Sequence, residues 1–124
     1  MKTDIQEIQI SLIELLKKEF PALRASKDNE KVFEVTGCIP AMQGKQKVEG
    51  HYFASIMPKP KDVRLYFFPI YTHVDAFAEI SPDLRKFLKG KSCFHIKKLS
   101  PEIETEIQGM IRKGVELYQS DGLI

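Results

Sequence analysis

The 124-residue sequence lacks several features that would assign it to a specialised class of protein. It has two cysteines, Cys38 and Cys93, which are far apart and show no zinc-site spacing. No apolar run approaches the roughly 20 residues that cross a bilayer, so a membrane-spanning role is excluded. Lys and Arg exceed Asp and Glu by only two, which argues against nucleic acid and membrane surfaces as partners.

What is present is typical of an ordinary globular domain. The length is that of one domain, and the hydrophobic fraction of 43% is close to the globular average. The polar start, Met1 to Asp4, shows no signal peptide, and isolated thiols in such a chain are expected to be reduced and largely buried. We therefore predict one domain, residues 1–124, located in the cytoplasm.

Helical patterns are found at both ends of the chain. Thr3 and Gln6 have the spacing of a capping box at the start of an amphipathic helix that ends near Pro21. A second long helix is predicted to begin at Ser100-Pro101, and its expected buried side is Ile103, Ile107, Met110, Ile111, Leu117 and Tyr118.

Two glycines interrupt the second long helix. Gly109 and Gly114 each cost about 1 kcal/mol relative to alanine inside a helix. This cost indicates that a close contact between the helix and a sheet uses them, and Gly122 is expected to end the helix.

The middle of the chain is rich in strands. Strands are predicted over residues 31–36, 48–57, 63–68 and 93–97, with a loop over 38–47 and short helices over 72–77 and from Ser81 to Gly90. This order predicts an α+β fold: an antiparallel β-sheet with N-terminal, middle and C-terminal helices packed on it as a two-layer sandwich.

The hairpin between residues 48 and 68 is the most informative part of the sequence. If Met57 pairs with Val63, one face carries Glu49, His51, Phe53, Ser55, Leu65 and Phe67, and the other carries Val48, Tyr52, Ala54, Ile56, Arg64, Tyr66 and Phe68. Neither face is simply polar. In an antiparallel sheet with one solvated face, hydrophobic and polar residues normally alternate along each strand. The sequence favours helices over both faces; the alternative is a partly open aromatic surface bounded by Arg64.

Three segments of the sequence resemble one known family. They are VEGHYFA (48–54), VRLYFFPIY (63–71) and GKSCF (90–94), and the last, placed before a strand and a helix beginning Ser-Pro, is the most specific. With Ile39-Pro40, they are similar to the YdhG-like family of small bacterial domains, largely of unknown function, over about residues 33–122. The resemblance implies an α+β architecture and a cytoplasmic location.

Some members of that family are labelled frataxin-like iron chaperones. Iron binding of that type implies an acidic face on the first helix and the neighbouring strand, and the first helix of this chain has Asp4, Glu7, Glu14 and Glu19 among lysines. Carboxylates in a first helical turn are typically solvated and stabilise the helix N-terminus. Asp4 and Glu7 are therefore only weak metal candidates. The residues themselves predict no cofactor, and the family label is the only reason to consider iron.

One pair of residues has the chemical types of a catalytic nucleophile and its base. Cys93 and His95 lie two apart in a predicted strand and so point to the same face, where a base could activate a thiol. No third group that would orient the imidazole is identifiable, and free cysteine usually serves packing. An enzyme that uses Cys93 and His95 is kept as an alternative, and we predict no catalytic residue.

These observations predict a non-enzymatic binding protein. The candidate binding residues are Tyr52, Arg64, Tyr66 and Phe68 on one sheet face, and the partner is a protein or a small ligand. A second copy of the chain is another candidate partner, and the frataxin-like iron chaperone is the alternative function.

Overall fold

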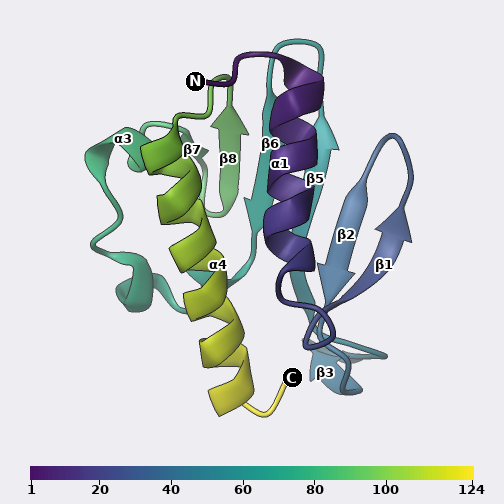
Figure 1. Ribbon diagram of the computed structural model, residues 1–124. Helices are drawn as coiled ribbons and strands as arrows, with labels where there is room; N and C mark the ends of the chain where they lie inside the picture. The colour runs from purple at the N-terminus through teal and green to yellow at the C-terminus, as the bar shows by residue number, and fades with distance from the viewer.

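The computed structural model, which describes residues 1–124, contains an antiparallel sheet with helices on one of its faces (Figure 1). Six strands lie in the order β1-β2-β5-β6-β8-β7. Their bounds are β1 (Arg24–Asp28), β2 (Phe33–Thr36), β5 (Tyr52–Pro58), β6 (Val63–Phe67), β7 (Leu88–Lys89) and β8 (Cys93–Ile96). The predicted α+β architecture is confirmed.

The remaining elements are helices and one small hairpin. The hairpin is β3 (Ala41–Gln43) with β4 (Gln46–Val48), and the helices are α1 (Ile5–Lys17), α2 (Pro69–Thr72), η1 (Val74–Phe77), α3 (Pro82–Arg85) and α4 (Pro101–Ser120). In Figure 1, α1 and α4 cross the same face of the sheet and α3 lies beside β7. No helix has the length and apolar character needed to span a membrane.

Several predicted boundaries are wrong for local reasons. The predicted loop over 38–47 contains the β3–β4 hairpin, whose turn uses Gly44 at a φ of 64°. Gly50 separates β4 from β5, so residues 48–57 are not one strand. The helix capped by Ser81 ends at Arg85 because residues 88–89 join the sheet edge as β7.

Both long helices begin with a side-chain cap. The cap of α1 is Asp4, not Thr3: its carboxylate accepts a hydrogen bond from the Glu7 amide at 3.1 Å. Ser100 caps α4 as predicted, accepting from the Ile103 amide at 3.2 Å. The predicted buried side of α4 is confirmed except at Leu117, which is half-buried.

The hydrophobic core lies between α1, α4 and one face of the sheet, which we call the inner face. Twenty-five buried residues form one cluster. The sheet residues of the inner face are at most 1% exposed: Phe33, Val35, Ala54, Ile56, Leu65, Phe67, Phe94 and Ile96. At about 25 cal/mol per Å² of apolar surface, this burial is the main source of stability.

The β5–β6 register differs by one residue from the predicted one. Pro58, not Met57, pairs with Val63, so Ile56 lies opposite Leu65. Because side chains alternate between the two faces along a strand, a register shift of one residue moves each side chain of that strand to the other face. Ala54 and Ile56 are consequently on the inner face, and their predicted position beside Tyr66 is wrong.

A bulge in β5 restores Tyr52 to the opposite face. Val35 pairs with Ala54 and Thr36 with Tyr52, so Phe53 has no partner in β2. Phe53 and Ala54 are both buried, and Phe53 packs edge-on against Phe67 with ring centroids 5.6 Å apart. Tyr52 therefore projects away from the helices.

The sheet face opposite the helices is the outer face. It carries Glu34, Tyr52, Ser55, Met57, Arg64, Tyr66, Cys93 and His95, most of them partly exposed. Both long helices pack on the inner face, so the expectation that helices cover both faces is wrong. The alternative, a partly open aromatic surface, describes the molecule.

The two glycines within α4 have different surroundings. A Cβ atom on Gly114 would lie 2.9 Å from Phe67 Cζ and 3.1 Å from Phe53 Cζ, so the predicted close contact with the sheet is confirmed there. At Gly109, a Cβ would meet no atom within 4 Å, so that glycine serves no such contact.

These surroundings predict opposite effects of alanine at the two positions. Gly114→Ala should lower the free energy of unfolding by about 1–3 kcal/mol because the buried rings must move. Gly109→Ala should raise it by up to about 1 kcal/mol through helix propensity alone. Urea denaturation of both variants measures the difference, and equal midpoints would contradict the described contact of Gly114.

Candidate functional site

The four sequence-predicted binding residues meet on the outer face of the sheet. Tyr52, Arg64 and Tyr66 project onto it from β5 and β6 and are partly exposed. Phe68 directly follows β6, and its ring centroid lies 5.5 Å from that of Tyr52. The structure thus brings Tyr52, Arg64, Tyr66 and Phe68 to the one sheet face without a helix. Val48, predicted beside them, lies instead in the β3–β4 hairpin.

Strand pairing places further polar residues beside these four. Glu34, Ser55, Tyr66 and Cys93 form one row across β2, β5, β6 and β8. Met57, Arg64 and His95 form the next row. From the sequence, Cys93 and His95 form a separate candidate site, because no local pattern indicates that β8 lies beside β6.

Tyr52 is fixed in place by contacts within the outer face. Its hydroxyl lies 2.7 Å from Ser55 Oγ, and Ser55 is only 2% exposed. Burial raises the pKa of Tyr52 to about 12, and burial also raises the pKa of Tyr66. Both side chains are therefore neutral phenols at physiological pH, which present an aromatic ring and a hydroxyl group.

Arg64 is held at the hairpin end of the outer face by a buried carboxylate. Asp62, 6% exposed, accepts a hydrogen bond from Arg64 Nε at 3.3 Å, and its other oxygen lies 3.8 Å from His95 Nδ1. A hollow of about 320 Å³ beside this pair is lined by Lys59, Pro60, Lys61, Asp62, Arg64 and Lys97. Four cations around one carboxylate give this end a positive charge.

The aromatic residues of the outer face continue toward the β7 edge of the sheet. Phe68 contacts Tyr52 on one side and Tyr71 on the other, with a centroid separation of 5.6 Å from Tyr71. The ammonium of Lys91 lies 5.5 Å from the centroid of the Tyr71 ring. An aromatic row with a cation at its end therefore borders the sheet.

Cys93 lies half-buried on the outer face, where it pairs with Tyr66 across β8 and β6. Burial raises the pKa of its thiol, an effect that the nearby Tyr66 hydroxyl and Arg64 only partly offset. His95 Nδ1 faces Asp62 at 3.8 Å. A catalytic cysteine requires a lowered pKa and a base in hydrogen-bond reach, and the geometry here favours the neutral thiol.

The two free cysteines should differ in reactivity. Cys38 is exposed, whereas Cys93 is half-buried on the sheet. At pH 7.5, iodoacetamide should alkylate Cys38 at least about tenfold faster than Cys93, because alkylation requires an accessible thiolate. Labelling of Cys93 should accelerate only above the usual thiol pKa of about 8.5. Peptide mass spectrometry measures both rates, with Cys38→Ser as a control; preferential labelling of Cys93 near neutral pH would instead support the enzyme alternative.

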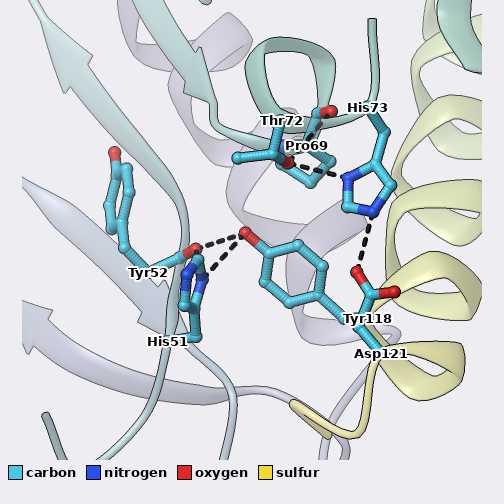
Figure 2. A network of polar contacts seen from close by, with 7 residues as sticks. All are labelled: His51, Tyr52, Pro69, Thr72, His73, Tyr118 and Asp121. Carbon is cyan, nitrogen blue, oxygen red and sulfur yellow. Dashed lines mark hydrogen bonds and ion pairs between the residues drawn. The ribbon is translucent and has the colours of Figure 1, made fainter. Parts of the chain in front are cut away.

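A separate polar network joins the end of α4 to β5 and α2 (Figure 2). The Tyr118 hydroxyl donates to the Tyr52 carbonyl at 2.6 Å and lies 3.2 Å from His51 Nδ1. Burial raises the pKa of Tyr118, so its hydroxyl stays protonated and can donate this hydrogen bond. This pair fixes the start of β5 against α4.

The second half of the network resembles a hydrolytic triad in composition. His73 Nδ1 lies 2.7 Å from Thr72 Oγ1, and His73 Nε2 lies 2.8 Å from Asp121 Oδ2 (Figure 2). A hydrolase also needs a substrate hollow at the nucleophile, and Thr72 and His73 line none of the four hollows of about 190–780 Å³. The arrangement fastens the last turn of α4 to α2.

The weak metal candidates, Asp4 and Glu7, lie at the start of α1, and Glu19 lies beyond the end of that helix. Asp4 caps that helix through the Glu7 amide, and Glu19 pairs with Arg112 at 2.8 Å. No three His, Cys, Asp or Glu side chains converge in a geometry that holds a metal ion. These residues do not fit a resident iron site.

No family model, no curated protein and no solved structure matches this chain. The likeness to the YdhG-like family accordingly stays a prediction from the residues.

Proposed function

We propose that this chain is a small, non-enzymatic cytoplasmic binding protein that docks a partner protein on its outer sheet face. The observation that carries the proposal is a sheet face without a helix, on which Tyr52, Arg64, Tyr66 and Phe68 lie together. Uncovered aromatic surface of this kind usually marks an interaction site. The two free thiols support the reducing compartment.

The chemistry of the outer face favours a protein over a small ligand. Tyrosine and arginine are the residues that most often dominate the binding energy of protein interfaces. Small ligands are usually enclosed in a hollow. Tyr52, Tyr66 and Phe68 line none of the four hollows of about 190–780 Å³, and the hollow at Arg64 is cationic. Its lysines favour a partner with an acidic patch beside its apolar contact.

A photo-crosslinking experiment tests whether this surface is used. Benzoylphenylalanine replaces Tyr66 on the outer face and, as a matched control, Gln108, which is exposed on α4. Irradiation in cells should give a discrete adduct from position 66 and none from position 108. An adduct of twice the chain mass would identify a second copy as the partner. The same adducts from both positions, or none from position 66, would contradict the proposal.

Substitutions then measure the contribution of each side chain. With the crosslinked partner purified, Tyr66→Ala and Arg64→Gln should each weaken binding by about 10- to 100-fold, because a central tyrosine or arginine contributes roughly 2 kcal/mol or more. Arg112→Gln, which makes the same charge change on α4, should leave the dissociation constant unchanged. Circular dichroism verifies folding, and unaltered binding by both outer-face variants would overturn the assignment.

The iron-chaperone alternative makes a different prediction. Because Asp4 caps α1 and Glu19 pairs with Arg112, we expect calorimetric titration with ferrous iron to show no saturable binding. Saturable binding that disappears in an Asp4→Asn, Glu7→Gln variant would favour the chaperone over the docking protein.

A further inference from the structure

A large hollow lies at the β7 edge of the sheet, away from the hairpin end of the outer face. Its volume is about 780 Å³, within the range of roughly 300–1,000 Å³ typical of ligand pockets. It is formed by α2 and η1 on one side and by α3, β7 and the turn that follows β7 on the other. We call this hollow the edge cleft.

The edge cleft has an apolar lining that is open to solvent. Ile70 and Phe77 are buried at its base, and Leu88 is half-buried. Tyr71 is 44% exposed and Val74 is 64% exposed, and both belong to the few large hydrophobic side chains that the fold leaves in water. A ligand that covered these two side chains would gain the free energy of their burial.

Two fixed cations border this apolar lining. Arg85 Nη2 donates to the carbonyl oxygens of Phe77 and Ala78, each at 3.2 Å, which holds the guanidinium at the cleft. The Lys91 ammonium is held 5.5 Å from the centroid of the Tyr71 ring. Asp75 is the one carboxylate in the lining, so the cleft carries two positive charges and one negative charge.

We propose that the edge cleft binds a small organic anion with a flat aromatic body and one carboxylate. The body would lie against Tyr71 and Val74, and the carboxylate would approach Lys91 and the free N–H groups of Arg85. The edge cleft adjoins the docking surface of the proposed function through the contact between Tyr71 and Phe68. None of the four docking residues lines the cleft, so neither inference depends on the other.

The probe is 2-naphthoate, compared with its neutral analogue 2-naphthalenemethanol. In ¹⁵N–¹H spectra of the full chain, naphthoate should shift the amides of Tyr71, Val74, Leu88 and Lys91, with a dissociation constant of about 1 mM or below for a ligand of this size. The neutral alcohol should bind at the same amides about 5- to 10-fold more weakly. Shifts that map to other residues, or equal affinity for the two compounds, would overturn the proposal.

Paired variants test the lining and the charge separately. Val74→Glu should weaken naphthoate binding by about tenfold or more, because the new carboxylate would repel the carboxylate of naphthoate. Met42→Glu makes the same charge change at a side chain that is 60% exposed in the β3–β4 hairpin, and it should have no effect.

Lys91→Gln keeps the proposal testable even if Val74→Glu fails to fold. It should weaken naphthoate binding several-fold and leave the neutral alcohol unaffected, whereas Lys45→Gln, an exposed lysine in the β3–β4 turn, should change neither. Equal losses for the anion and the alcohol would show that Lys91 acts by packing alone, and unchanged naphthoate binding in Lys91→Gln would exclude its role as an anion partner. Either result would contradict the anion assignment.

Discussion

The close approach of α4 to the sheet at Gly114 determines how the rest of the molecule is arranged. The rings of Phe53 and Phe67 lie directly beneath that glycine, and Tyr118 packs edge-on against Phe53 with centroids 5.2 Å apart. Because α1 packs against the same face, the apolar residues of the central strands are buried on that face. The opposite face receives no helix, and its half-buried polar and aromatic residues follow from that one-sided packing.

The bulge at Phe53 links the core to the outer face. It directs two consecutive side chains, Phe53 and Ala54, toward the helices, and so returns Tyr52 to the side of Tyr66. The Tyr118 hydroxyl then binds the Tyr52 carbonyl from the core side. One irregular backbone position thus fixes both the packing of α4 and the position of a proposed binding residue.

The sequence predicted the long helices well and the sheet only in part. A 3.6-residue period with a Ser-Pro start was sufficient for α4, whereas β1, with the sequence RASKD, is exposed throughout and has no apolar pattern to indicate it. The predicted grouping of Tyr52, Arg64, Tyr66 and Phe68 on one face holds although the predicted register is one residue off, because the bulge in β5 returns Tyr52 to that face. Neither the register nor the order of β6 and β8 depends on local sequence, so neither could be read from it.

The edges of the sheet restrict how anything can bind to it. On one side β1 places Arg24, Lys27 and Asp28 in water, and on the other β7 has only two residues. Charged or very short edge strands discourage the addition of another strand. A partner of the proposed kind would therefore approach perpendicular to the sheet and be recognised by side chains. Recognition of that kind depends on the identity of a few residues rather than on a backbone shape that any extended peptide could match.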